Sequence, residues 1–218
     1  MTYDFRKHTI TRKCDKEYKD YHKYKPYLKE DFKNRCAYCN MHDEWVKPLS
    51  FQIDHFIPRA SFQKAGRDDL DSDYQNLMYS CPVCNRLKSD AFTGEIGTDK
   101  IQNPFFYNPV DTDYNTIFSR DEMGRIQSQD ELGKDMIKRL QLYRPTKQMA
   151  WFLDELQQVY NEIGRKLNME SDSPKRQKLE CAYNKIGNTL FQKHRFFVHS
   201  YDTEKSMKNI QIEQDEGA

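Results

Sequence analysis

The positions of apolar residues along the chain predict a small strand-containing core followed by a helical region. Residues 50–56 alternate apolar and polar side chains, which is typical of a short strand. Apolar residues then recur at spacings of four and three over residues 149–167, and again over 179–197, which predicts two helices. The intervening Glu-Ser-Asp-Ser-Pro segment breaks the pattern, so we expect a helical hairpin with narrow apolar seams.

The N-terminal region carries a tyrosine pattern. Tyr18, Tyr21 and Tyr24 recur every three residues, which suits one face of a short helix between Asp15 and Pro26. A second helix is expected from Pro26 through residue 32. Two uses of the tyrosines stay open, because the rings can pack on a small core, which we favour, or stack on nucleic acid beside the neighbouring basic residues.

Two further segments are interpreted from local signals. Residues 114–119 and 125–127 flank an Asp-Glu-Met-Gly turn, which predicts a β-hairpin. Residues 61–74 form an acidic stretch that lacks the spacing of a calcium loop, and we interpret it as a surface loop.

Composition narrows the classes of protein that fit. Of the 218 residues, 32% are charged and 13% aromatic, mean hydropathy is −1.02 and the net charge is +1. The core is therefore expected to be thin, rich in aromatic rings and helped by a structural metal. No apolar run is long enough for a membrane span, and the first residues lack the apolar core of a secretory signal. We expect a cytoplasmic protein with reduced or metal-bound cysteines.

Four of the six cysteines form two C-x-x-C pairs, Cys36/Cys39 and Cys81/Cys84. Each pair sets two thiolates on one side of a tight turn, and two such turns complete a tetrahedral zinc site. The stretch between the pairs exceeds the roughly 15–20 residues of a simple zinc ribbon, so a folded segment is expected there. The alternatives are a redox pair or buried free thiols, and His42 is a weaker candidate ligand.

The segment between the pairs carries candidate chemistry. Asp54 and His55 end the predicted strand, Asn76 follows after the acidic stretch, and Asn85 comes directly after Cys84. The order C-x-x-C, I-D-H-F-x-P, N-L and C-x-x-C-N-x-x-K resembles the HNH endonucleases over about residues 28–92. The resemblance implies a ββα-metal core held by a four-cysteine zinc site, in the variant with asparagine at position 85.

The same residue types fit phosphodiester hydrolysis. His55 suits a general base near neutral pH, whereas Asp54 and Asn85 offer oxygen ligands to a catalytic Mg²⁺ or Mn²⁺. Asn76 is expected to support the site indirectly, by fixing the backbone or the ring of His55. The alternative is that these residues serve only as turn and cap residues. Arg59, Arg86 and Lys88 are candidate contacts to DNA phosphates.

The expected fold is α+β, an HNH core with N-terminal helices and a C-terminal helical hairpin. We expect a basic helical segment at 1–27, the nuclease core with its hairpin at 28–128, a helical region at 129–200 and a partly disordered acidic tail at 201–218.

The expected function is cleavage of DNA. A free-standing DNA binder usually has a basic excess, so a net charge of +1 favours recruitment by a partner. Small HNH proteins that work beside an ATPase in bacterial anti-phage defence are similar. The alternatives are a homing or restriction endonuclease, and a zinc module that binds nucleic acid without cutting.

Overall fold

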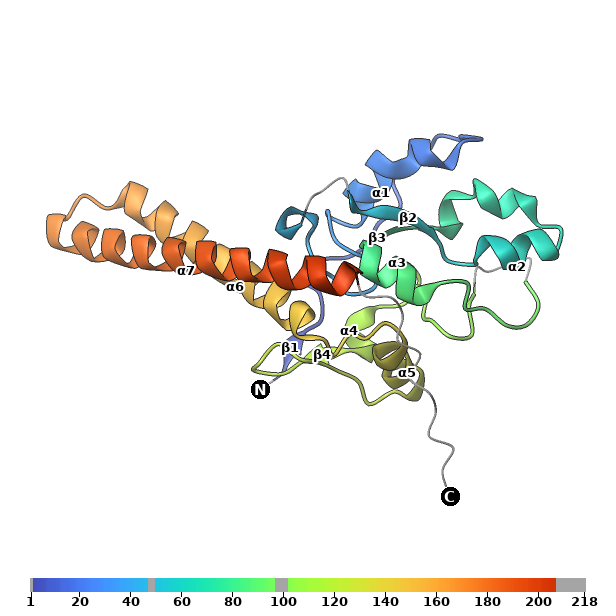
Figure 1. The fold of residues 1–218 in the computed structure, drawn as a ribbon. Coiled ribbons are helices and arrows are strands. Elements are labelled where there is room, and N and C mark those ends of the chain that lie inside the picture. The colour runs from blue at the N-terminus through green and yellow to red at the C-terminus, as the bar shows by residue number, and fades with distance from the viewer. Residues whose placement is uncertain (1, 47–49, 97–101, 207–218) are drawn as a thin grey trace, which may run out of the picture.

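An antiparallel strand pair followed by a helix forms the centre of the molecule (Figure 1). The computed structural model describes residues 2–46, 50–96 and 102–206. Strand β2 (Gln52–His55) pairs with β3 (Leu77–Ser80) so that Gln52 lies opposite Ser80. Helix α3 (Pro82–Lys88) begins directly after β3, because Cys81 caps it and proline suits its first turn. This ββα unit and the helices around it confirm the predicted α+β fold.

The N-terminal region differs in part from the prediction. Strand β1 (Tyr3–Asp4) leads through an extended segment to a single 3-10 turn, η1 (Tyr21–Tyr24), and to helix α1 (Lys25–Asp31). The helix expected between Asp15 and Pro26 is thus limited to η1, whereas α1 begins beside Pro26 as predicted. The predicted boundary at residue 27 falls inside α1.

The tyrosines of this region pack on the core. Tyr24 is buried and its hydroxyl accepts a hydrogen bond from the backbone of Tyr18, while Tyr18 and Tyr21 are partly buried. In the described structure these rings therefore serve packing, the alternative that the sequence analysis favoured.

The acidic stretch before β3 is more ordered than a surface loop. It contains most of helix α2 (Arg59–Lys64) and the 3-10 turn η4 (Asp68–Asp71), and it ends where the 3-10 turn η5 (Tyr74–Asn76) begins. Phe62 and Leu70 are buried against Ile57 in a small separate cluster. The interpretation as a surface loop was wrong, because two apolar side chains among the acidic ones anchor the segment. Another 3-10 turn, η2 (Asp43–Trp45), precedes β2.

The segment that follows the ββα unit forms a second small sheet. Helix α4 (Tyr114–Ile117) precedes strands β4 (Ser119–Arg120) and β5 (Ile126–Gln127), and the sheet has the order β1-β4-β5. A hairpin is present, but the predicted first strand is mostly the helical turn α4. The reason is Asp113, whose side chain caps that turn by accepting the N–H of Asn115. Helix α5 (Glu131–Arg139) comes next.

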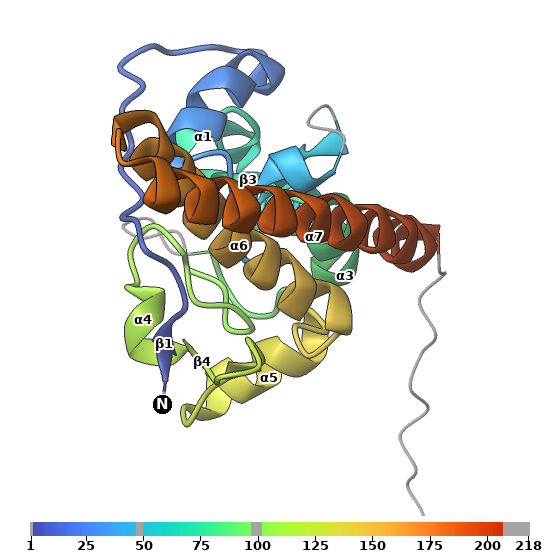
Figure 2. The ribbon, with the colours of Figure 1, turned by 90° about the vertical axis from the view of Figure 1, so that its left-hand side faces the viewer.

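Two long antiparallel helices project from the body and form what we call the arm (Figures 1 and 2). Helix α6 (Pro145–Met169) and helix α7 (Ser173–Ser206) confirm the predicted hairpin, with its break after Met169. Helix α7 continues past the predicted boundary at residue 200, and Tyr201 and Glu204 are buried. The start of the predicted acidic tail is therefore helical, and its remainder from 207 lies outside the described residues.

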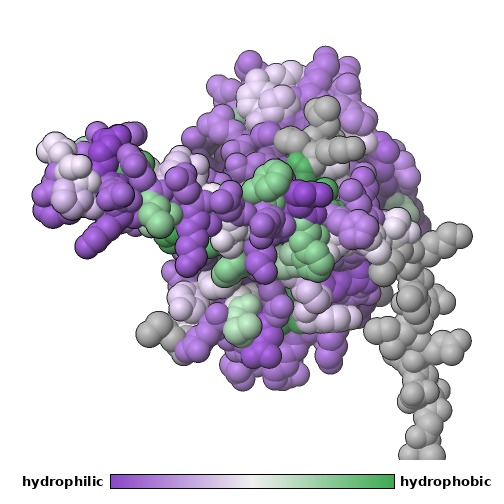
Figure 3. All heavy atoms as spheres, turned by 60° about the vertical axis from the view of Figure 1, so that its left-hand side comes forward, coloured by the Kyte–Doolittle hydropathy of each residue, from purple (hydrophilic) through white to green (hydrophobic). Residues whose placement is uncertain are grey.

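The arm is held together by a reciprocal pair of aromatic rings. Tyr160 of α6 and Tyr183 of α7 stack with their centroids 4.1 Å apart. Each ring lies over a glycine of the facing helix, Tyr160 over Gly187 and Tyr183 over Gly164, and a Cβ at either glycine would meet the ring at 3.1 Å. In the view of Figure 3, hydrophilic residues cover most of the projecting arm. Most of the exposed large apolar side chains among the described residues nevertheless belong to α6 and α7, namely Phe152, Val159, Met169, Phe191 and Phe196.

Candidate metal and nuclease site

The four paired cysteines meet in one buried cluster. Cys36 and Cys39 lie in the turn after α1, while Cys81 and Cys84 lie at the start of α3. The four sulfur atoms lie within 4.8 Å of one another, and those of Cys39 and Cys81 are 3.9 Å apart. Sulfurs about 2.3 Å from a tetrahedral zinc are about 3.8 Å apart, so the cluster can hold zinc. Among the described residues, His42 is not part of this cluster, and its ring caps η2 instead.

The two knuckles are joined directly through the backbone. The N–H of Ala37, inside the first pair, donates to the carbonyl of Tyr79 on β3 at 2.8 Å. The second pair follows β3 without a break. The cysteine cluster therefore ties the loop after α1 to the β3–α3 junction, and α3 carries one of the predicted catalytic residues, Asn85.

Electrostatics among the sulfurs favour a thiolate at Cys81 but a thiol at Cys39 and Cys84, whose pKa values are raised by hydrogen bonds from the other cysteines. Burial acts to raise the pKa of Cys81, but hydrogen bonds from Cys36, Cys39 and Cys84 hold it well below its usual range. Burial likewise acts to lower the pKa of Lys147, whereas the nearby cysteine sulfurs and, less strongly, Glu204 raise it well above its ordinary value. Lys147 has no hydrogen-bond partner among the described residues, so its ammonium fits a negatively charged zinc–thiolate centre.

His55 ends β2 with its ring held on one side by a backbone carbonyl. Its Nε2 lies 2.9 Å from the carbonyl oxygen of Asp71, and its ring packs against Tyr21 and Phe62. A carbonyl oxygen only accepts hydrogen bonds, so Nε2 carries the proton and Nδ1 carries the lone pair in the neutral ring. The geometry leaves Nδ1 as the nitrogen that can accept a proton.

The surroundings of His55 keep its ring neutral. Burial lowers the pKa of His55 below its usual value, and the carbonyl and carboxylate of Asp71 offset this only in part. The ring is therefore uncharged at neutral pH, the state that a general base requires.

Asp54 lies on the other face of β2, among hydrogen-bond donors. Its carboxylate accepts from the hydroxyl of Tyr38 and, at 3.2 Å, from the ammonium of Lys88. Lys88 is fully buried and also donates to the carbonyl oxygen of His55 at 2.8 Å. Among the described residues, the side chains of Asp54 and His55 form no hydrogen bond with each other, and Lys88 links the carboxylate of Asp54 to the backbone carbonyl of His55.

Asn85 shares the Asp54 side of the ββα unit. Its amide donates to the side chain of Gln52 at 2.7 Å, and Gln52 and Asp54 lie two positions apart on β2, hence on the same face. Asn85 and Lys88, three positions apart on α3, also share a face. The amide oxygen of Asn85 and the carboxylate of Asp54 are hard donors of the kind that Mg²⁺ prefers, although Lys88 competes for Asp54.

Asn76 fixes backbone just beyond His55. Its side-chain oxygen accepts the N–H of Ile57 at 2.8 Å, while its amide donates to the carbonyls of Ile57 and Leu70. Its own carbonyl accepts from Phe56. The residue is fully buried. Asn76 holds the turn after His55 rather than the ring or backbone of His55 itself.

The three predicted phosphate contacts have separate environments. Arg59 is half exposed, lies over the Tyr21 ring and pairs with Asp71 at 2.7 Å, so it borders the His55 side. Arg86 donates to the carbonyls of Glu204 and Lys205 at the end of α7. Lys88 is buried and bonded to Asp54 and to the His55 carbonyl, and its contact to phosphate stays a prediction.

Several residues that shape the site carried no usable sequence signal. Tyr38 binds Asp54, the Asp71 carbonyl orients His55, and buried Asn103 donates to the carbonyl of Phe56. The only one of these residues with a sequence signal was Tyr38, because it lies inside the first C-x-x-C pair. The carbonyl of residue 71 could orient His55 with any side chain at that position, so the residue type gives no signal of this role.

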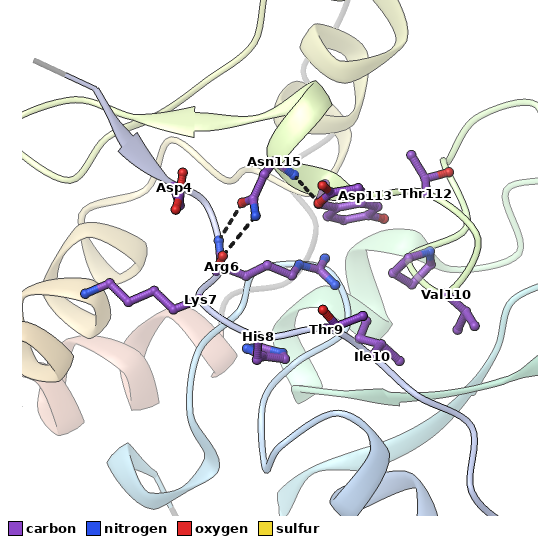
Figure 4. Close-up of a pocket in the computed structure, with 12 residues that line it drawn as sticks. Asp4, Arg6, Lys7, His8, Thr9, Ile10, Val110, Thr112, Asp113 and Asn115 are labelled. Atoms are coloured by element: carbon purple, nitrogen blue, oxygen red, sulfur yellow. Dashed lines mark hydrogen bonds between the residues drawn. The ribbon is translucent and has the colours of Figure 1, made fainter.

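A cavity of about 670 Å³ lies elsewhere, between the N-terminal segment and residues 109–115 (Figure 4). There Asn115 bonds both backbone groups of Arg6 at 3.0 Å, in the manner of a neighbouring strand. None of the predicted site residues lines this cavity. The cavity therefore lies along the line where the N-terminal segment packs against the body, and we assign it no site.

Comparison with known proteins agrees with this geometry in one segment. Residues 36–91 match the family model of the HNH endonucleases, and this range holds all four clustered cysteines and the ββα unit. The family implies metal-dependent nuclease activity. No curated protein and no solved structure matches the chain. In the described parts of the chain, no helix has the length and apolarity needed to cross a membrane.

Proposed function

We propose that this protein is a metal-dependent endonuclease that hydrolyses DNA, with His55 as the general base. The observation that carries the proposal is the neutral His55 ring, oriented by the Asp71 carbonyl at the end of β2 in the matched ββα unit. Nδ1 of this ring accepts a proton from the attacking water. Lys88 donates to the carbonyl of His55 and Asn76 accepts the N–H of Ile57, so the backbone that follows the ring is held in place.

Two metals are part of the proposal. The four cysteines hold a structural Zn²⁺, which ties the first knuckle to the ββα unit. Asp54 and Asn85 would hold a catalytic Mg²⁺ or Mn²⁺, which supplies charge stabilisation at the phosphate and the leaving oxygen. Binding there requires the Asp54 carboxylate to keep a lone pair free while Lys88 and Tyr38 donate to it. Arg59, at the exposed edge beside His55, is the proposed phosphate contact.

The biological setting is also proposed. A net charge of +1 gives little electrostatic attraction to DNA, which supports recruitment by a partner protein. We propose a cytoplasmic role in bacterial anti-phage defence, with an ATPase as the partner class that the resemblance suggests. Homing and restriction endonucleases are the alternative settings.

A non-catalytic zinc module that binds nucleic acid is the second candidate. The ion pair of Asp54 with Lys88 favours it, because a bound ammonium lowers the affinity of a carboxylate for a cation. Such a module does not need His55 to be neutral and oriented, so loss of this ring separates the two candidates.

The test is cleavage of a plasmid in Mg²⁺ or Mn²⁺, with and without candidate partners, by wild type and His55→Ala. We expect His55→Ala to fold, keep its zinc and cleave at least about 100-fold more slowly, as expected for loss of a general base. His199→Ala, at an exposed position of α7, is the matched control and should cleave like wild type. Equal cleavage by His55→Ala would contradict the assignment.

A further inference from the structure

The arm brings a lysine into the interior of the body, where a cation is unusual. Lys147 lies in the first turn of α6, and its side chain is 0% exposed. Its ammonium has no hydrogen-bond partner among the described residues. That turn contains no acidic residue, and the helix N-terminus itself repels a positive charge. A buried ammonium in this position requires an anion from elsewhere in the fold.

Glu204 of α7 does not satisfy this requirement alone. Its Oε1 is 3.9 Å from the Lys147 ammonium, which is beyond hydrogen-bond reach. Glu204 is also shared, because Arg144 approaches it at 3.4 Å and the Thr146 hydroxyl donates to it. The other acidic groups that act most on Lys147 are the sulfurs of Cys39, Cys81 and Cys84.

A second unpaired donor reaches the same place from the other helix. Tyr201 of α7 is 2% exposed and packs in the same buried cluster as the four cysteines, and its hydroxyl forms no well-aligned hydrogen bond among the described residues but has the Cys81 sulfur within reach. The same three cysteines act on it, Cys81 most strongly. The Lys147 ammonium lies 5.8 Å from the centre of the Tyr201 ring. Both helices of the arm therefore direct an unsatisfied donor toward the cysteine cluster.

A zinc ion held by four thiolates supplies the missing acceptors. Such a centre carries a net charge of about −2, and its sulfurs accept hydrogen bonds in the shell around the metal. We propose that Lys147 and Tyr201 are outer-shell donors to the zinc–thiolate centre, so that the arm completes a metal site whose ligands all lie in the matched segment. The proposal rests on the structural zinc proposed above, and it assigns a function to residues outside 36–91.

The test is zinc retention against a competing chelator, measured on purified full-length variants. Lys147→Met removes the charge with little change in volume, and Tyr201→Phe removes only the hydroxyl. We expect Lys147→Met to weaken zinc binding about tenfold or more, and Tyr201→Phe to weaken it less. Lys166→Met is the control, since Lys166 is an exposed lysine of the same helix, and it should retain zinc like wild type.

The outcomes separate this proposal from the nuclease proposal. Wild-type zinc affinity in folded Lys147→Met and Tyr201→Phe would overturn it. If Lys147→Met fails to fold, the zinc affinity of Tyr201→Phe decides the question, because this variant loses only one oxygen atom and is expected to fold. A wild-type protein that binds no zinc would overturn the metal assignment and this proposal together. A protein that shows the expected zinc affinities but cuts no DNA would support this proposal and contradict the nuclease.

Discussion

Asn85 and Asp54 are unequal as metal ligands at the scale of single residues. Asp54 is buried and already accepts two hydrogen bonds, whereas the Asn85 side chain lies near the surface with one bond to Gln52. A cation bound here is therefore expected to depend strongly on the ligand charge at position 85, the side that substitutions can change without disturbing the core.

Asn85→Asp tests this dependence. A carboxylate in place of the amide adds a negative charge to the proposed ligand set, so half-maximal plasmid cleavage should need about tenfold less Mg²⁺. Gln177→Glu, which adds the same charge at an exposed position on the arm, should leave the Mg²⁺ requirement unchanged. An unchanged Mg²⁺ titration in Asn85→Asp would show that residue 85 is not a ligand.

The roles of individual residues could be predicted from the sequence where their spacing alone defines a site. The cysteine pairs foretold the buried cluster, because each C-x-x-C turn can bring two sulfurs together locally. The catalytic roles of His55, Asp54, Asn76 and Asn85 stay predictions. Burial of Lys88 could not be foreseen, since a lysine placed after a C-x-x-C pair looks like a surface contact until its partner Asp54 is located in space.

Short elements depend on caps and contacts that the apolar pattern does not contain. The alternation over residues 50–56 predicted β2, although burial does not follow it, because Asp54 and His55 on opposite faces of the strand are both buried. The pattern failed at 114–117, where the Asp113 cap favours a helical turn over a strand. The β4–β5 hairpin is too short to be stable alone and relies on β1 and on Trp151 of α6.

Gly124 in that hairpin gives an element-scale prediction. Its φ is +75°, and a Cβ there would lie 2.4 Å from the Trp151 ring. Gly124→Ala therefore combines backbone strain with a clash and should lower the free energy of unfolding by about 2–4 kcal/mol in urea denaturation. Met123→Ala, next to it and 70% exposed, should change stability by less than about 0.5 kcal/mol. A Gly124→Ala protein as stable as wild type would contradict the close packing seen here.

The stability of the whole molecule is expected to fall in mild acid. Burial and the nearby charges of Arg6 and Arg35 lower the pKa of His8 to about 4. Between pH 6.5 and 4 the unfolded chain takes up a proton at His8 that the folded protein does not, so acidification favours unfolding. The stabilisation is complete above about pH 6.5 and is lost as the pH falls toward 4.

His8→Gln should remove part of this acid sensitivity. Because the ring is only partly buried, we expect the loss of unfolding free energy between pH 7 and 4.5 to shrink by about 1 kcal/mol. Urea denaturation at several pH values measures it, and His199→Gln on the surface of α7 is the comparison. The same pH dependence in His8→Gln and wild type would show that His8 is not the group responsible.

At the scale of the whole molecule, the two ring-over-glycine contacts fix the register of helix α6 against helix α7. Because Tyr160 must face Gly187 while Tyr183 faces Gly164, neither helix can slide along the other without pushing a ring into a bulkier side chain. Residues inserted into only one helix, between the rings and the tip of the arm, would shift both rings away from the glycines that they face. Equal additions to both helices would preserve them, so the arm can be lengthened in matched steps while its base stays undisturbed.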